Sequence, residues 1–272
     1  MILMHNAVND KAKPRILGTL FAFSIYLFLF LPIFVVILNS FNSNKSKPYA
    51  TFKGFTFDWY IKLFDNSALL GSFGNTLIVA LASTILSVLI GTLAAVGMHR
   101  YKFKGKEAID ALLYIPVVIP EIILGISLLS VFAWVSIPRG LITLILSHVT
   151  FSTPFVIFTL RARLSGYDLT FEEAAMDLGA NRLKTFFYVT LPLILPGILS
   201  GGLLAFTLSI DDVIISYFVN GTVKTFPLKV MESIKSGVAP DVNALSTLIL
   251  LVTTLIVVLT QSGIFNKAAK TK

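Results

Sequence analysis

Residues 171–192 read FEEAAMDLGANRLKTFFYVTLP and form a charged segment between two strongly apolar runs. The runs are Leu141–Leu160 before the segment and Leu191–Phe218 at its end. An apolar run of about 20 residues has the length needed to cross the hydrocarbon core of a bilayer. The sequence therefore predicts that this segment is a polar connection between two membrane helices.

Long apolar runs recur over the whole chain of 272 residues, of which 56% are hydrophobic and 13% charged. A soluble domain is about one quarter charged. The runs predict spans at about residues 16–38, 74–98, 108–134, 141–160, 191–218 and 244–263. Closed membrane barrels instead show segments of about 10 residues with alternating hydrophobicity, and this sequence has no such segments. We expect an all-α polytopic membrane protein with six transmembrane helices, an N-terminal tail (1–15) and a single transmembrane domain (16–272).

The distribution of Lys and Arg predicts the orientation of the spans. Of the 22 basic residues, 14 lie in the tails and loops of one side and 8 on the other side. Because short cytoplasmic loops carry the excess of positive charge, both termini and residues 165–190 are expected in the cytoplasm. The net charge of +8 is thus explained by membrane orientation rather than by nucleic-acid binding.

The first long loop contains Phe57–Phe64, with the sequence FDWYIKLF. Trp59 and Tyr60 beside Lys62 favour a short helix at the level of the lipid headgroups. Contact with a substrate is the alternative role of these aromatic residues.

Prolines and glycines in several spans predict local breaks in the helices or close contacts between them. The prolines are Pro116 and Pro120 in the third span, Pro154 in the fourth, and Pro192 and Pro196 in the fifth. Each removes a backbone donor, which a membrane protein tolerates where other helices or a water-filled cavity satisfy the freed carbonyls. Gly201 and Gly202 are expected to allow close helix approach.

Three acidic residues fall deep within apolar runs: Glu121 in the third span, and Asp211 and Asp212 in the fifth. A carboxylate in the hydrocarbon region costs about 3 kcal/mol and is normally turned toward a cavity or a partner. These residues are therefore candidates for a cation pathway. Since neighbours on a helix point about 100° apart, one aspartate is expected on the pathway and the other at a helix break or a neighbouring helix. The alternative is local hydrogen bonding near the outer end of a shorter helix.

His148 is predicted to form hydrogen bonds between helices rather than to bind a metal, because no cysteine exists and no His or carboxylate follows at helical spacing. The chain also lacks H-E-x-x-H, G-x-S-x-G and the phosphate-binding G-x-x-x-x-G-K-[ST] pattern. We expect no catalytic, metal or cofactor site on this chain, so an energy source would belong to another protein.

The segment 171–192 has signals for a helix–turn–helix. Thr170 and Glu173 have the spacing of a capping box, and Glu172 and Glu173 suit the positive end of the helix dipole. Gly179 is placed to end the first helix in the left-handed conformation. A second short helix is expected from about Asn181 to Val189, until Leu191-Pro192 turns the chain into the membrane.

The spacing Glu173-Ala174-Ala175, three residues, Gly179, nine residues, Val189, one residue, Leu191-Pro192 resembles the EAA motif of ABC importer permeases. Every fixed position matches, with Val189 in place of the usual Ile. Within that family the chain is similar to the second permease subunit of spermidine/putrescine importers. The subfamily likeness lies in Phe206–Val213, Leu178–Ala180, Val242–Leu245, Asn39–Ser43, Tyr101–Lys106 and Ser147–Phe151.

The resemblance implies the type I ABC importer permease fold and a cytoplasmic EAA coupling loop, residues 165–190, on which ATPase subunits dock. It implies a heterodimer with a sister permease, two cytosolic ATPase subunits that carry ATP and Mg, and an extracytoplasmic polyamine-binding protein. The expected function is translocation of spermidine or putrescine by alternating access in the cell membrane of a prokaryote. The candidate coupling residues are Glu172, Glu173, Ala174, Ala175, Asp177, Gly179, Leu191 and Pro192. The candidate pathway residues are Glu121, Asp211 and Asp212.

Two alternatives stay open at the level of sequence. One is a permease of the same family for ferric ion, thiamine or an oxyanion, although an anion carrier should show a basic residue within the spans. The other is a cation carrier that does not depend on ATP.

Overall fold

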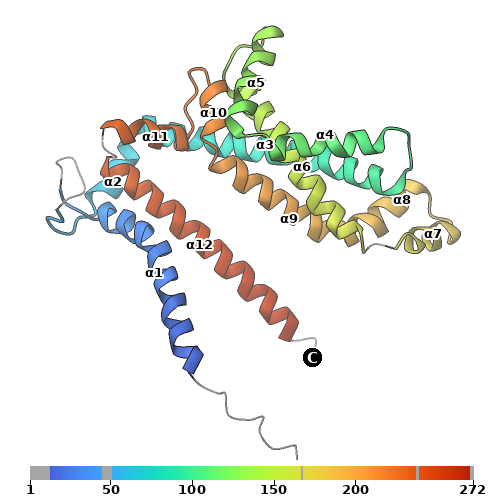
Figure 1. Ribbon diagram of the computed structural model, residues 1–272, viewed down its shortest axis with the longest axis horizontal. Coiled ribbons are helices and arrows are strands. Elements are labelled where there is room, and N and C mark those ends of the chain that lie inside the picture. Colours follow the sequence, from blue (N-terminus) through green and yellow to red (C-terminus); the bar gives the residue numbers. More distant parts are fainter. Residues whose placement is uncertain (1–12, 45–50, 167, 237–238, 270–272) are drawn as a thin grey trace, which may run out of the picture. The chain divides into compact units, whose positions relative to one another are not determined.

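Helices make up almost all of the described chain (Figure 1). The computed structural model describes residues 13–44, 51–166, 168–236 and 239–269. The helices are α1 (Lys13–Ser40), α2 (Asp58–Asp65), α3 (Ser67–Arg100), α4 (Lys106–Val118), α5 (Glu121–Trp134), α6 (Leu141–Leu164), α7 (Thr170–Asp177), α8 (Arg182–Thr185), the π-helical turn η1 (Phe186–Thr190), α9 (Leu191–Ile210), α10 (Ile214–Val219), α11 (Phe226–Ser236) and α12 (Pro240–Ala269). The expected all-α class is confirmed. Most of the predicted tail, residues 1–12, lies outside the described residues.

Four helices in the described ranges are long and apolar enough to cross a membrane. They are Gly18–Ser40, Ser67–Arg100, Leu141–Leu164 and Arg182–Ile210. The bent pair of α4 and α5 makes a fifth span if it is counted as one. The predicted sixth span lies in α12, whose described apolar part, Pro240–Leu255, is shorter. The total of six spans and the single-domain organisation stay predictions.

The predicted third span, 108–134, is not one straight helix. It is divided into α4 and α5, whose axes are bent by 111° at the break. Ile119 at the break is extended, with ψ 135°, because the ring of Pro120 disfavours helical geometry in the residue before it. Pro116, by contrast, lies inside α4 without ending it. The break places Glu121 at the first position of α5.

The predicted fifth span, 191–218, also differs from the structure. Helical structure continues from α8 through η1 into α9, so the expected turn at Leu191-Pro192 does not exist. Pro192 has no amide hydrogen to donate to the carbonyl four residues earlier, and the wider π-helical turn directly before it accommodates this loss. The helix then ends at Ile210, and residues 211–213 separate it from α10.

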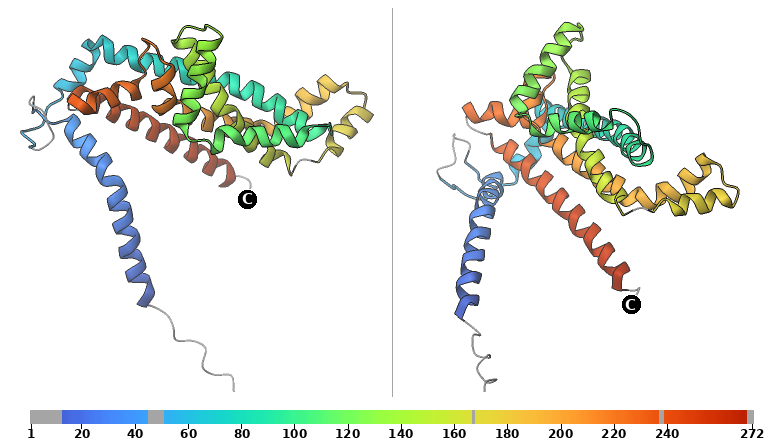
Figure 2. Two further views of the ribbon diagram at one scale, coloured as in Figure 1. Left: turned by 45° about the horizontal axis from the view of Figure 1, so that its top comes forward. Right: turned by 45° about the vertical axis from the view of Figure 1, so that its right-hand side comes forward.

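Residues 67–235 form one compact unit, in which α3, α6 and α9 pack together (Figures 1 and 2). Val156 of α6 is buried between two glycines from its neighbours. A β-carbon on Gly91 of α3 would lie 2.8 Å from a methyl group of Val156, and one on Gly201 of α9 would lie 3.3 Å from the same methyl group. The expected close approach at Gly201 is therefore confirmed. Gly202 faces Val88 of α3 in a similar way.

The second unit consists of the described parts of residues 1–66 and 236–272. In it, α12 contacts both α1 and the short helix α2. Since α2 runs from Asp58 to Asp65, the helix expected at Phe57–Phe64 is confirmed. Trp59 donates from Nε1 to the carbonyl of Asn42 at 2.7 Å, and the hydroxyl groups of Tyr60 and Ser40 lie 2.7 Å apart. These bonds hold α2 against the end of α1. The described residues of α1 from Gly18 to Val35 are exposed.

Candidate functional site

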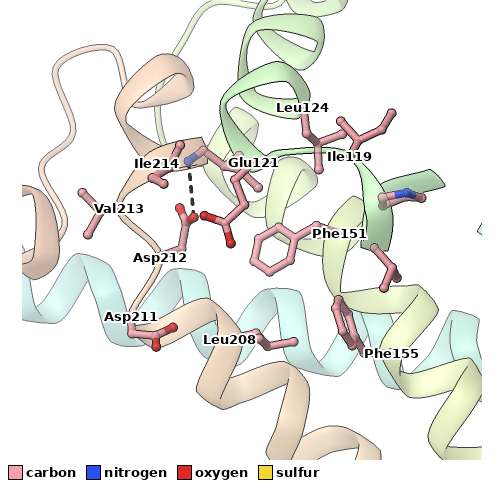
Figure 3. A pocket seen from close by; sticks show the side chains of 13 residues that line it. Ile119, Glu121, Leu124, Phe151, Phe155, Leu208, Asp211, Asp212, Val213 and Ile214 are labelled. Atoms are coloured by element: carbon pink, nitrogen blue, oxygen red, sulfur yellow. Dashed lines mark hydrogen bonds between the residues drawn. The ribbon is translucent and has the colours of Figure 1, made fainter. Parts of the chain in front are cut away.

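The three candidate pathway acids, Glu121, Asp211 and Asp212, line one pocket of about 360 Å³ (Figure 3). Its other lining residues are Pro116, Val117, Ile119, Leu124, Phe151, Phe155, Leu208, Val213, Ile214 and Ile215. The two helix breaks bring the acids together, because Glu121 follows the break after α4 and both aspartates lie in the break after α9. The structure therefore assembles the candidate pathway residues in one place.

Asp212 is the inner acid of the pocket and is only 9% exposed. Its Oδ2 accepts the amide hydrogen of Ser216 at 2.8 Å, and its Oδ1 accepts that of Ile215 at 3.3 Å. Oδ2 also lies 3.4 Å from Nε2 of His148. Asp212 thus caps the first turn of α10 and contacts a neighbouring helix, which is one of the two roles expected for the aspartate pair.

Asp211 and Glu121 have exposed side chains. Asp211 directly follows α9 as its C-cap residue, and Glu121 begins α5. In Figure 3 the side chains of Glu121 and Asp212 point toward each other, and Asp211 lies at the end of the α9 ribbon. Both aspartates line the pocket because the chain is not helical at residues 211–213, so the 100° separation expected for helical neighbours does not apply.

His148 is 1% exposed and lies next to the pocket. It is the central residue of a buried network of polar contacts. Its Nδ1 lies 2.6 Å from the hydroxyl of Ser209, and its Nε2 lies 3.0 Å from the hydroxyl of Ser216. Ser209 in turn lies 3.1 Å from the hydroxyl of Ser83. The expected inter-helix role of His148 is confirmed, since the network joins α3, α6, α9 and α10. Among the described residues, no cluster of His, Cys, Asp or Glu suits a metal ion.

In the predicted coupling loop, residues 165–190, α7 ends in the expected left-handed glycine turn. Gly179 has φ +90° and donates to the carbonyl of Met176 at 2.9 Å. Ala180 donates to the carbonyl of Ala175 at 3.0 Å, which completes a Schellman motif. Asn181 then caps α8 by accepting the amide hydrogen of Lys184 at 2.8 Å.

The predicted capping box at the start of α7 is wrong. The helix begins at Thr170, and its cap position is Leu169, which has no side-chain acceptor. Asp168 instead accepts the amide hydrogen of Thr170 at 3.0 Å. The helix therefore begins one residue earlier than the Thr170–Glu173 spacing implied.

The candidate coupling residues divide into an outward and an inward set. The side chains of Glu173, Ala174 and Asp177 and the residue Gly179 are exposed, whereas Ala175 is half-buried. Glu172, in contrast, is 7% exposed and lies 2.6 Å from Nη2 of Arg100. Of the last two motif residues, Leu191 is half-buried and Pro192 is exposed within the continuous helix.

Several residues that bind the candidate site residues were not predicted from the sequence. Arg100 and Thr190 bind Glu172, and Ser209 and Ser216 bind His148. Asp110, near the start of the predicted third span, pairs with Arg161 of α6 at 2.5 Å. An unmatched acid at the start of a span and an Arg at the end of the next span were the only available signs of that pair.

The family model and the curated proteins that match this chain all describe membrane components of transport systems. Residues 87–266, more than half of the chain, match the family described as "binding-protein-dependent transport system inner membrane component". The chain is 40% identical over 242 residues to the spermidine/putrescine transport system permease protein PotC of Haemophilus influenzae, which covers 89% of this chain and 93% of that protein. It is also 40% identical over 256 residues to the putrescine transport system permease protein PotI of Escherichia coli, covering 91% of this chain and 89% of the relative.

Solved structures show the same fold at low sequence identity. A chain of a bacterial ABC transporter involved in the import of the acidic polysaccharide alginate aligns with a TM-score of 0.72 at 15% identity, covering 94% of this chain and 99% of that chain. A chain of the alginate ABC transporter in complex with an alginate-loaded periplasmic protein aligns with a TM-score of 0.66 at 19% identity, covering 90% and 91%. The expected ABC importer permease fold is confirmed, and the chain belongs to the family of binding-protein-dependent transport system inner membrane components.

Proposed function

We propose that this chain is the permease subunit of an ATP-driven importer that carries polyamines such as spermidine and putrescine into the cytoplasm by alternating access. The observation that supports this most directly is the pocket with two exposed carboxylates, Glu121 and Asp211, and the buried Asp212 behind them. Among the described lining residues there is no Lys or Arg. The pocket therefore suits a ligand with more than one positive charge.

The apolar part of the pocket fits the rest of a polyamine. Phe151, Phe155 and Leu208 line it beside the acids. Aromatic faces attract ammonium groups, and apolar side chains pack against the methylene segments between those groups. Carboxylates beside apolar surface thus match a linear chain of methylenes that ends in ammonium groups. The names of the 40% identical PotC and PotI proteins point to the same substrates.

The proposal includes partners that this chain requires. Two cytosolic ATPase subunits would bind ATP and Mg and dock on the coupling loop, with Glu173, Ala174, Asp177 and Gly179 on the exposed surface. Ala175, Leu191 and Pro192 would shape that surface and its junction with α9. A sister permease would complete the pathway, and an extracytoplasmic binding protein would deliver the polyamine. The orientation has both termini in the cytoplasm, and this chain acts without catalysing a reaction.

Uptake by the complete importer in proteoliposomes tests this function. Labelled spermidine should accumulate only when ATP and the binding protein are both supplied, and unlabelled putrescine should compete with it. Ferric ion, thiamine and molybdate should not compete. Accumulation without ATP would point to an autonomous carrier, whereas ATP-dependent uptake of one of the other compounds alone would show a different substrate. Either result contradicts the proposal.

A further inference from the structure

Glu172 forms a closed triangle of polar contacts with Arg100 and Thr190. Nη2 of Arg100 lies 2.6 Å from Oε1 of Glu172. The hydroxyl of Thr190 donates to the same Oε1 at 2.7 Å, and Nη2 of Arg100 donates to that hydroxyl oxygen at 3.0 Å. The carboxylate of Glu172 is therefore engaged inside the protein and is not available as a surface charge.

The three residues come from three different elements. Arg100 is the last residue of α3, Glu172 lies in the first turn of α7, and Thr190 is the last residue of η1, directly before α9. Figures 1 and 2 show α7 and α8 at the end of this unit where α9 begins. The side chains of Glu172 and Arg100 are 9% and 22% exposed. Removing one member of such an enclosed pair leaves the other charge without compensation, so the link is sensitive to small changes.

The link leads from the coupling loop to the helices that build the pocket. From Arg100, α3 runs back to Gly91, which packs against Val156, and Val156 in turn packs against Gly201 of α9. From Thr190, α9 runs directly to Asp211. A displacement of α7 would therefore act on two packed helices, one of which ends at the pocket.

We infer that Arg100, Glu172 and Thr190 are positioning residues that couple movement of the EAA segment to α3 and α9. This inference rests on the proposed function and changes one part of it. Glu173, the adjacent exposed acid, contacts the ATPase, whereas Glu172 transmits the resulting movement within this chain. Loss of the link should leave ATPase subunits bound and hydrolysing ATP while less polyamine is moved for each ATP.

The test measures ATP hydrolysed per spermidine imported by the complete importer in proteoliposomes, together with retention of the ATPase subunits on purification. Thr190→Val removes the hydroxyl and keeps the shape, and Thr190→Ser is its matched control because it keeps the hydroxyl. Glu172→Gln removes the charge. Since Nη2 alone makes both contacts of Arg100, Arg100→Lys keeps a donor and the charge. We expect Thr190→Val and Glu172→Gln to raise the ratio about fivefold or more, with Thr190→Ser unchanged and Arg100→Lys in between.

The exchanged pair Arg100→Glu with Glu172→Arg gives an independent test, because it should restore part of the coupling lost in Glu172→Arg alone. An unchanged ratio in both Thr190→Val and Glu172→Gln, with the wild type importing spermidine normally, would overturn the inference and leave the proposed function intact. Loss of ATPase subunits from the Glu172→Gln complex would also overturn it, because it would make Glu172 a docking residue. A wild-type complex that hydrolyses ATP without importing spermidine would instead count against the proposed substrate.

Discussion

The imidazole of His148 and the carboxylate of Asp212 lie 3.4 Å apart, and their side chains are 1% and 4% exposed. They join α6 to the break between α9 and α10. Because two backbone amides also bind Asp212, this acid is held by the protein itself. Glu121 and Asp211 are the acids with exposed side chains in the same pocket. The three acids therefore differ: Asp212 is bound within the protein, whereas Glu121 and Asp211 are exposed in the pocket.

Replacing His148 should destabilise the permease. His148→Ala removes the partner of Ser209, Ser216 and Asp212 in an enclosed site, which should lower the free energy of unfolding by about 2–4 kcal/mol. The measurement is thermal unfolding of the purified chain in detergent. Thr150→Val is the matched control, because Thr150 is exposed on the same helix and should change the midpoint little. An unaltered midpoint for His148→Ala would show that the network is not important for stability.

Adding a single methyl group at Gly91 should disturb the packing of α3 on α6. The new β-carbon would lie 2.8 Å and 2.9 Å from two carbons of Val156, so Gly91→Ala should cost about 1–3 kcal/mol. Gly97 lies on the same helix and has nothing within 4 Å of its β-carbon position, so Gly97→Ala should be neutral or slightly stabilising. Thermal unfolding in detergent compares the two variants. Equal midpoints would contradict the close approach at Gly91.

The turn after α7 should require a residue that accepts positive φ. Gly179 has φ +90° and open space around its β-carbon position, so the cost of a side chain there is a backbone cost of about 1–2 kcal/mol. Gly179→Val should weaken co-purification of the ATPase, and Gly179→Asn should do so less. Gly166→Ala, also in the coupling loop with open space, is the control. If Gly179→Val retained the ATPase as well as Gly166→Ala does, the turn would have no role in docking.

Glu173 should contribute to docking without contributing to stability. Its side chain is exposed, and surface substitutions generally change stability by about 0.5 kcal/mol or less. We expect Glu173→Ala to reduce the amount of ATPase that co-purifies while leaving the unfolding midpoint unchanged. Glu107→Ala, an exposed acid in the first turn of α4, should have neither effect. Full retention of the ATPase by Glu173→Ala would remove Glu173 from the docking surface.

The sequence located the long apolar helices well, because hydrophobic runs of bilayer length are a direct consequence of the solvent that surrounds them. It did not locate the breaks within them. Pro120 ends a helix, but Pro116, Pro154 and Pro196 lie inside helices, so proline alone did not identify the break. The break at residues 211–213 has no proline, and the contact of Asp212 with His148 that accompanies it joins residues far apart in the sequence.

The candidate site was predictable in its residue types and less so in its geometry. Buried charge in an apolar run singled out Glu121, Asp211 and Asp212, which the structure gathers in one pocket. The opposite orientations of Glu172 and Glu173 were not predictable, because both suit the first turn of a helix. The acid that turns inward is the one that meets Arg100, 72 residues earlier in the chain, and Thr190, 18 residues later.

The most direct test of the central claim is spermidine uptake by the complete importer carrying Asp211→Asn together with Glu121→Gln. These changes remove the exposed charges of the pocket and keep the size of both side chains. Because hydrogen bonds to charged groups are the strong ones, uptake at low spermidine should fall about tenfold or more, while the ATPase subunits stay bound. Asp58→Asn, an exposed acid at the start of α2, is the control and should import normally. Unchanged uptake in the double variant would contradict the account, since polyamine would then cross without these carboxylates.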